Sequence, residues 1–322
     1  MTIQGHPIPS SARTERIVVI LPCLNEEVAI AGVVKAFRRC LPEAEIVVID
    51  NGSTDQTIER ALEAGAQVRR HGMRGKGNAL RYAFASIEAD IYVIADGDGT
   101  YDAAAAPVLV DKLRHEGLDM VVGVRRDTAA EAYRRGHRLG NRLFNILVQW
   151  TFGGRFTDIF SGYRVFSRAF VKSFPALSNG FDIETEMSVH AIELNMPIAE
   201  IPTAYRERAE GSASKLNTYR DGLRILSRIL LLSKHLRPLM LFSIAAILLS
   251  VASLALGLPV VFEFIETGLV RRLPTALAAA SLGIMALISF ATGLVLDTIA
   301  YGQRENKRLF YLTVSQRHNA GQ

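Results

Sequence analysis

The stretch IYVIADGDGTYD, residues 91–102, decides the fold. Its first five residues are apolar and rich in β-branched side chains, and they end abruptly at Asp96 and Asp98, each followed by a glycine. A spacing of two residues places both carboxylates on one face of an extended chain, where they repel each other. A hard divalent cation with oxygen ligands offsets that repulsion. The stretch therefore predicts a buried strand ending in a cation site that keeps positions open for substrate phosphates. A polar loop that caps the next helix is the alternative.

Strand-like and helix-like segments alternate around this stretch. Further strands are predicted at residues 16–22 (RIVVILP), 45–50 (EIVVID) and 67–70, and helices at residues 25–39, from residue 55 to about 64, and at 76–86. This alternation predicts an α/β fold with a mostly parallel sheet and helices on both faces. Ligands of such sheets gather at the carboxyl ends of the strands. Polar clusters stand at three of those ends, at residues 25–26, 50–51 and 96–98.

The following region is less regular. We expect helices at residues 107–116, 134–152 and 183–194, and strands at residues 119–124 and 198–201.

Composition limits the class of protein. Of the 322 residues, 49% are hydrophobic, enough for a soluble domain and a lipid-facing part. The two cysteines, Cys23 and Cys40, form no CxxC pair, which argues against a disulfide framework or a structural zinc site and fits a reducing compartment. Residues 1–15 are polar without an apolar core, so we expect a flexible tail rather than a signal peptide.

Positive charge is concentrated in residues 125–168, which contain nine arginines, no lysine and three acidic residues. Arginine without lysine favours bidentate recognition of phosphate. The interleaving of aromatic and basic residues expected of a single-strand nucleic-acid binder is absent, so no nucleic-acid partner is expected.

Two long apolar stretches predict a membrane hairpin. Residues 238–262 and 273–296 carry no charge, and each is long enough to span a bilayer as a helix; buried helices of a soluble protein are the alternative. By the positive-inside rule, the basic residues outside both spans place the soluble domain in the cytoplasm of a multi-pass inner-membrane protein. These residues are Lys234, His235, Arg237, Arg304, Lys307 and Arg308, opposed weakly by Arg271 and Arg272 in the connecting loop.

Residues 217–237 predict an amphipathic interfacial helix. Arg220, Arg224 and Arg228 recur every four residues, and leucine and isoleucine cover much of the remaining surface. Such a helix lies on anionic lipid with its arginines at headgroup depth. A helix packed on the soluble domain is the alternative.

Six ordered motifs resemble those of family 2 glycosyltransferases. They are LPCLNE (21–26), DNGSTD (50–55), GKGNA (75–79), DGD (96–98), DIFSGYR (158–164) and GSASKL (211–216). The pattern is most similar to the dolichyl-phosphate mannose and glucose synthases and their bacterial polyprenyl-phosphate counterparts. The resemblance covers residues 16–216 and implies a GT-A type, Rossmann-like domain there, with residues 238–322 holding the membrane hairpin and a cytoplasmic tail.

The resemblance also implies a nucleotide-sugar site. Its residues would be Pro22, Leu24, Asn25, Glu26, Asp50, Asn51, Lys76 and Asp96. The usual pattern has tyrosine at position 24 and aspartate at position 51, so the choice between a UDP- and a GDP-sugar stays open. For Lys76, a solvated lysine on a turn is the alternative.

The metal and the acceptor follow from the same resemblance. Asp98, helped by Asp96, would hold Mg²⁺ or Mn²⁺ against the donor pyrophosphate, although Thr100 stands where some relatives have a glutamine ligand. A polyprenyl phosphate is already anionic and needs fixed cations more than a base. The candidates for binding its phosphate are Arg125, Arg126, Arg134, Arg135, Arg164 and Lys215, of which Arg164 and Lys215 are also candidate catalytic residues.

Asp182 and Glu184 form the remaining acidic cluster. In similar enzymes such a pair lies near the sugar, and with a hydroxyl acceptor one carboxylate acts as the base. Capping of the helix that follows is the alternative.

The sequence thus predicts a membrane-bound, metal-dependent, inverting hexosyltransferase that moves one sugar from a nucleotide-diphosphate sugar to a polyprenyl phosphate. Two alternatives stay open: transfer to a lipid hydroxyl or a glycan, and a non-catalytic nucleotide-sugar-binding scaffold. A homo-oligomer is compatible with either.

Overall fold

The computed structural model describes residues 15–126, 156–178, 180, 183–206 and 237–319. The chain divides into two compact units, residues 1–216 with 307–322, and residues 217–306. The predicted helices at residues 134–152 and 217–237 lie outside the described residues.

The first unit is built on a seven-stranded sheet. Its strands are β1 (Ile17–Cys23), β2 (Glu45–Asp50), β3 (Gln67–Arg70), β4 (Ile91–Ile94), β5 (Met120–Arg126), β6 (Arg164–Ser167) and β7 (Ile198–Ala204). They lie side by side in the order β3-β2-β1-β4-β6-β5-β7. Only the pairs β4–β6 and β5–β6 among these strands are antiparallel, which confirms the prediction of a mostly parallel sheet.

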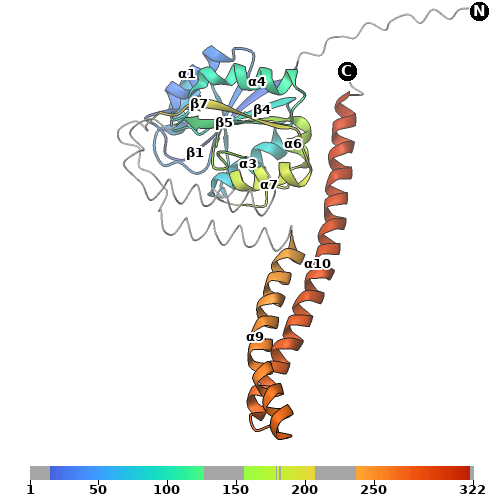
Figure 1. The fold of residues 1–322 in the computed structure, drawn as a ribbon. Coiled ribbons are helices and arrows are strands. Elements are labelled where there is room, and N and C mark those ends of the chain that lie inside the picture. Colours follow the sequence, from blue (N-terminus) through green and yellow to red (C-terminus); the bar gives the residue numbers. More distant parts are fainter. Residues whose placement is uncertain (1–14, 127–155, 179, 181–182, 207–236, 320–322) are drawn as a thin grey trace, which may run out of the picture. The chain divides into compact units, whose positions relative to one another are not determined.

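Helices cover both faces of this sheet. They are α1 (Ile30–Cys40), α2 (Thr57–Glu63), α3 (Lys76–Ser86), η1 (Ala103–Ala105), α4 (Ala106–His115), α6 (Arg168–Ser173) and α7 (Ile183–Glu193). Helices α1 and α4 lie on one face, and α3, α6 and α7 lie on the other (Figure 1). Because both faces are covered, β4 is buried throughout and β1 is buried except for the half-buried Pro22, and both strands are continuous apolar runs.

Helix α1 begins five residues later than the sequence predicts. Asn25 adopts a left-handed backbone conformation with φ of 54°, which no helix interior allows. The N–H groups of Ala29 and Ile30 both bond the carbonyl of Glu26, so residues 26–29 form a turn that leads into the helix. The polar residues after β1 therefore lie in a loop at the strand end.

Strand β6 and helix α6 have no counterpart in the sequence prediction. β6 has only four residues, RVFS, and begins with a charged side chain, so its composition gives little strand signal. Its position matters because an antiparallel strand starts where its neighbour ends. Arg164 pairs with Ile94, and the SGYR motif is thereby placed beside the residues that follow β4.

His190 of α7 lies in an aromatic cluster beneath the sheet. Its ring contacts the edges of Phe170 and Phe174, with centroids 5.4 Å away in both cases. Its Nδ1 has no hydrogen-bond partner among the described residues. Burial, assisted by the nearby charge of Lys307, lowers the pKa of His190 to about 3. His190 is therefore neutral in the folded protein at any pH near neutrality.

The second unit contains all of α9 and most of α10. Helix α9 (Pro238–Thr267) ends at Gly268, whose φ of 69° gives a left-handed cap, and α10 (Leu273–Asn319) begins five residues later. Ser253 Oγ donates to Ala279 O at 2.8 Å, and Ser289 Oγ donates to Phe242 O at 3.1 Å, so the helices run antiparallel side by side.

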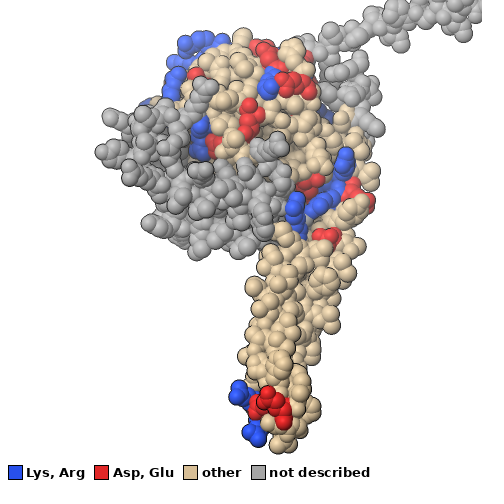
Figure 2. Space-filling view, viewed as in Figure 1, with Lys and Arg blue, Asp and Glu red and all other residues tan. Residues whose placement is uncertain are grey.

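Both helices are long and apolar enough to cross a membrane. Their outward surfaces expose residues such as Leu248, Ile265 and Leu287. In Figure 2 the shaft of the hairpin shows no charged side chains, and charges gather at the connecting turn, where Arg272 pairs with Glu263. The predicted spans lie within α9 and α10, although α10 continues as a helix well past residue 296.

The last turns of α10 belong to the first unit. Lys307 Nζ pairs with Glu193 Oε2 at 2.9 Å, and Tyr311 Oη donates to Asp119 Oδ2 at 2.7 Å. Asp119 also accepts from Ser167 Oγ at 2.6 Å. The end of α10 therefore contacts the end of α7 and the residue that precedes β5.

The low pKa of His190 predicts a loss of stability in mild acid. Below pH 6.5 the unfolded chain takes up a proton at this histidine and the folded chain does not, so stability falls as the pH falls. At pH 5 the loss is about 2 kcal/mol. The thermal unfolding midpoint in detergent should fall less between pH 7 and pH 5 in His190→Gln than in the wild type. His115→Gln, at an exposed histidine of α4, should keep the wild-type pH dependence, and an unchanged slope in His190→Gln would contradict the assignment.

Candidate active site

The loops after β1 and β2 are locked together by their own polar side chains. Thr54 N donates to Asn25 Oδ1 at 2.8 Å, and Asn25 N donates to Ser53 Oγ at 2.9 Å. Glu26 N donates to Thr57 Oγ1 at 2.8 Å. Pro22 and Leu24 are half-buried beside them, and Glu26 is buried. Five of the predicted nucleotide-site positions, Pro22, Leu24, Asn25, Glu26 and Asp50, are therefore brought together at two adjacent strand ends.

Asp50 is buried at the end of β2 and shapes the turn that follows. Its two carboxylate oxygens accept from Gly52 N at 3.3 Å and Ser53 N at 3.2 Å. These bonds hold the carboxylate at the strand end, where a bound nucleoside would be expected in a sheet of this type.

Asn51 is held by hydrogen bonds within the chain, and its predicted contact with the nucleotide stays a prediction. Its Nδ2 donates to Met73 O at 2.5 Å and more weakly to His71 O at 3.5 Å, and its Oδ1 accepts from Gly75 N. The side chain is therefore engaged within the chain. It clamps the loop of residues 71–75, which leads directly into Lys76 and α3.

Asp98 is buried after β4, only 3% exposed. Its Oδ1 accepts from Thr100 N at 3.1 Å and Thr100 Oγ1 at 2.7 Å, so Thr100 orients the carboxylate. Gly97 packs against Cys23, and a Cβ at position 97 would collide with the Cys23 sulfur. The glycine of the DGD motif thus allows β4 and β1 to end close together.

Lys76 lies between two carboxylates. Its ammonium pairs with Asp96 Oδ1 and with Glu184 Oε1, the latter at 2.6 Å, and its side chain is 7% exposed. Burial by itself would lower the pKa of Lys76, but Asp96 and Glu184 outweigh burial and raise the pKa above its ordinary value. In this structure the charge of Lys76 is directed to these two acids, and its contact with the nucleotide stays a prediction.

Glu184 comes from the first turn of α7 and is fully buried. Burial raises its pKa, and Lys76 offsets only part of that effect. Its Oε2 has no hydrogen-bond partner among the described residues. The ion pair joins residues from α3, the end of β4 and α7, three elements that are distant in sequence.

The SGYR motif lies against this ion pair and leaves room for it. A Cβ on Gly162 would lie 2.8 Å from Lys76 Nζ and 3.0 Å from Asp96 Oδ2, so only glycine fits there without displacing a charge. Gly162 N donates to Tyr101 Oη at 2.8 Å. Tyr101 lacks a motif-like signal in the sequence, and only the structure reveals its contact with the motif.

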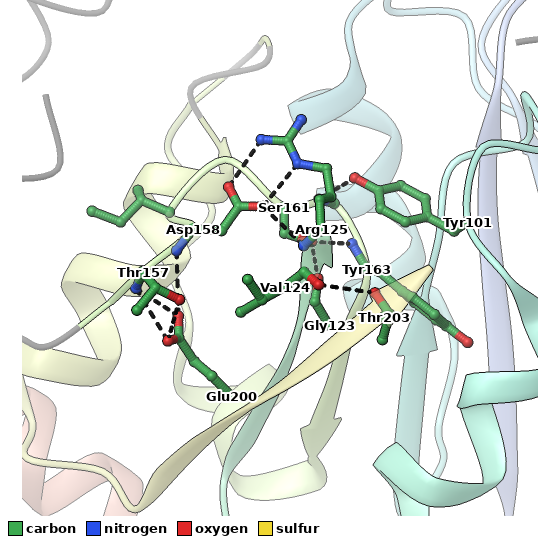
Figure 3. Close-up of polar contacts among 12 residues, drawn as sticks. Tyr101, Gly123, Val124, Arg125, Thr157, Asp158, Ser161, Tyr163, Glu200 and Thr203 are labelled. Atoms are coloured by element: carbon green, nitrogen blue, oxygen red, sulfur yellow. Dashed lines mark hydrogen bonds and ion pairs between the residues drawn. The ribbon is translucent and has the colours of Figure 1, made fainter. Parts of the chain in front are cut away.

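Arg125 lies at the end of β5, and one edge of its guanidinium binds the carboxylate of Asp158. Its Nε and Nη2 donate to the two oxygens of Asp158 at 2.8 and 2.9 Å (Figure 3). The guanidinium lies 5.5 Å from the centre of the Tyr205 ring. The Arg125 side chain is 26% exposed, so part of it remains accessible.

Arg164 is fully buried, contrary to its predicted role in phosphate binding and catalysis. Its Nε donates to Ser161 O at 2.9 Å, its Nη2 to Ile159 O at 2.6 Å, and its Nη1 to Ser188 Oγ at 2.9 Å. Burial lowers its pKa to about 10. With its donors bound to backbone and serine oxygens, Arg164 supports the loop of residues 159–161 and does not reach a substrate phosphate.

Several predicted residues cannot be placed. Arg126 ends β5, but its side chain lies outside the described residues, as do Arg134, Arg135, Asp182 and Lys215. Their assignments stay predictions.

The carboxylates fit a cation that substrate helps to bind. The described residues contain no group of three or more His, Cys, Asp and Glu side chains arranged to hold a metal. Asp98 and Asp96 offer the hard oxygen ligands that Mg²⁺ and Mn²⁺ accept, and Asp96 is shared with Lys76. A cation here would need phosphate oxygens and water to complete its shell.

Replacing Lys76 by methionine should leave Asp96 and Glu184 without their counter-charge. Removing one partner of a buried ion pair costs about 3–5 kcal/mol. We expect a large fall in the thermal unfolding midpoint and loss of transferase activity. Lys112→Met, which removes an exposed pair with Glu116, should leave both nearly unchanged. A Lys76→Met protein as stable as the wild type would contradict the structural role of the pair.

Replacing Asn51 by aspartate keeps the size of the side chain but removes the donor to Met73 O. A carboxylate would then face two carbonyl oxygens, and the loop of residues 71–75 should move away. We expect a KM for the donor raised about tenfold, measured by titration of the nucleotide sugar, with smaller effects on the acceptor KM. Asn51→Asp with an unchanged or lower donor KM would instead favour direct contact with the nucleotide.

Comparison with known proteins agrees with this architecture. Residues 18–174 match the family described as Glycosyl transferase family 2. The chain is 37% identical over 253 residues to the glycosyltransferase AglJ of Haloferax volcanii, covering 78% of this chain and 83% of AglJ. It is 31% identical over 210 residues to a dolichyl-phosphate hexose transferase of the same organism, covering 65% of this chain and 90% of that protein.

A solved structure shares the fold. Glucosyl-3-phosphoglycerate synthase of Mycobacterium tuberculosis, crystallised with Mn²⁺, UDP and phosphoglyceric acid, superposes with a TM-score of 0.55 and 27% identity over 68% of this chain and 77% of that one. The match to AglJ extends over most of both chains. This chain therefore belongs to glycosyltransferase family 2.

Proposed function

We propose that this protein transfers a hexose from a nucleotide-diphosphate sugar to a polyprenyl phosphate at a membrane surface, with inversion at the anomeric carbon. The observation that carries the proposal is the joint presence of a carboxylate cluster at the strand ends and two membrane-length apolar helices in one chain. A relative named as a dolichyl-phosphate hexose transferase supports the same acceptor class.

The donor would lie across the ends of β1, β2 and β4. Asp50 and Glu26 line the nucleoside side, and Asp98 with Asp96 faces the diphosphate. Mg²⁺ or Mn²⁺ held by Asp98 would neutralise the charge that grows on the departing nucleoside diphosphate. A relative of known structure binds Mn²⁺ and UDP together, which supports this assignment.

The acceptor phosphate needs little help from a base. Its oxygen is already anionic and forms a bond to the anomeric carbon while the bond from that carbon to the donor diphosphate breaks. The main obstacle is repulsion between two anionic substrates, and fixed cations reduce it. Arg125 is the described candidate for contacting this phosphate, with Arg126, Arg134, Arg135 and Lys215 as further candidates.

The apolar helices would hold the enzyme where a polyprenyl phosphate resides. The charge distribution around the spans supports a cytoplasmic location for the catalytic unit. A donor made in the cytoplasm would then reach the site directly, and the lipid-linked sugar would be released into the membrane.

Transfer to a hydroxyl acceptor is the second candidate. Glu184 favours it, because its pKa is raised and its Oε2 has no partner among the described residues. A hydroxyl acceptor requires such a base, whereas a phosphate does not. Glu184→Gln separates the two mechanisms, since loss of a base should lower kcat by about 10²–10⁴-fold for a hydroxyl and much less for a phosphate.

The decisive assay uses the full chain in detergent with Mn²⁺, undecaprenyl phosphate and a mixture of UDP- and GDP-sugars. We expect a new lipid-phosphate-hexose in the mass spectrum of the lipid fraction, absent after EDTA treatment and restored by added Mn²⁺. Asp98→Asn should lower product formation at least about 100-fold, because the metal site loses its charge.

Asp111→Asn, at an exposed carboxylate of α4, is the matched control and should retain activity. Nucleotide binding without product from any donor would shift the assignment to the hydroxyl acceptor or to the non-catalytic scaffold.

A further inference from the structure

Asp158 has no role in the mechanism proposed above. It binds Arg125, which among the residues with described side chains is the one proposed to contact the acceptor phosphate. We infer that Asp158, itself held by Glu200, is a positioning residue that sets the direction of the Arg125 guanidinium. This inference rests on the proposed function, in which Arg125 contacts the acceptor phosphate.

The contact between Asp158 and Arg125 is directional. The carboxylate receives Nε and Nη2 in a bidentate arrangement, at 2.8 and 2.9 Å, and also accepts from the backbone N of Arg125 at 3.3 Å. A bidentate pair fixes the plane of the guanidinium as well as its distance. The Tyr205 ring, 5.5 Å from the guanidinium carbon, limits movement in another direction.

The same contact leaves donors available. A guanidinium has five N–H groups, and the bidentate pair uses one on Nε and one on Nη2. Among the described residues no further partner holds Nη1, and the side chain is partly exposed. Asp158 therefore occupies one edge and leaves the opposite edge for a phosphate.

Glu200 anchors the segment that carries Asp158. Its carboxylate accepts from Thr157 N at 2.9 Å, from Thr157 Oγ1 at 2.7 Å and from Asp158 N at 3.5 Å (Figure 3). Glu200 lies on β7 and pairs with Val122 of the parallel neighbour β5. Val122 precedes Arg125 by three residues on that strand. One pair of strands thus fixes both Arg125 and the carboxylate that orients it.

The expected effect of removing the Asp158 charge differs between a positioning residue and a simple counter-ion. Asp158 neutralises Arg125, so its removal should strengthen nonspecific attraction of a phosphate. If direction matters more than net charge, removal should nevertheless weaken productive binding. The two effects have opposite signs, which makes the KM for the acceptor a sharp readout.

The test measures kcat and both KM values with a short-chain polyprenyl phosphate, using the full chain in detergent. We expect Asp158→Asn to raise the acceptor KM about tenfold with the donor KM unchanged. The double variant Asp158→Asn with Arg125→Ala should be no worse than Arg125→Ala alone, because Asp158 acts through Arg125. Glu200→Ala should raise the acceptor KM in the same direction, and it serves if Asp158→Asn does not fold.

Glu88→Gln is the control, since it weakens an ion pair with Lys172 far from the strand ends and should change neither KM. A lower acceptor KM in Asp158→Asn would show that Asp158 competes with the phosphate, and additive effects in the double variant would show a purely structural role. Either result would contradict the inference about Asp158 and leave the proposed function intact. Absence of transfer to any polyprenyl phosphate by the wild-type protein would overturn the proposed function and the inference with it.

Discussion

The ion pair of Lys76 with Asp96 and Glu184 is the contact on which the strand-end cluster depends. Two carboxylates approach each other in a largely dry environment, and they are tolerated because one ammonium lies between them. The arrangement constrains its neighbours. Gly162 must lack a side chain to leave room for the charges, and Asn51 must hold the loop from which Lys76 emerges. A single buried cation thus connects four of the six sequence motifs.

The antiparallel strand β6 makes this convergence possible. In a fully parallel sheet, the residues before a strand lie at the edge opposite to the ligand site. Because β6 runs against β4 and β5, the residues before it lie at the carboxyl ends of its neighbours. Gly162 therefore meets Asp96, and Asp158 meets Arg125. Reversal of this one strand places the DIFSGYR motif at the carboxyl ends of β4 and β5.

The sequence predicts most of the sheet but only part of the site. Strands β1, β2 and β4 are short β-branched runs with polar ends, so composition alone locates them within one or two residues. The sequence does not predict β6, because its four residues begin with arginine and show no clear hydrophobic periodicity. The sequence also does not predict the internal contacts of Asn51, Lys76 and Arg164. A polar residue in a motif gives the same sequence signal whether it faces a ligand or a buried group of the chain. Glu200 and Tyr101 act only through contacts that chain topology creates.

The charge balance at the strand ends leaves a role for further cations. Two of the described cations near the strand ends are committed to carboxylates, Lys76 to Asp96 and Glu184, and Arg125 to Asp158. They supply geometry more than net positive charge. In the proposed reaction, a diphosphate donor and a phosphate acceptor would together bring several negative charges to the same edge, and these charges would require compensation from elsewhere. A divalent cation at Asp98 would offset part of this charge. We propose that part of the excess of arginine over acidic residues between positions 125 and 168 supplies this compensation, whereas Arg164 in the same segment supports the loop of residues 159–161.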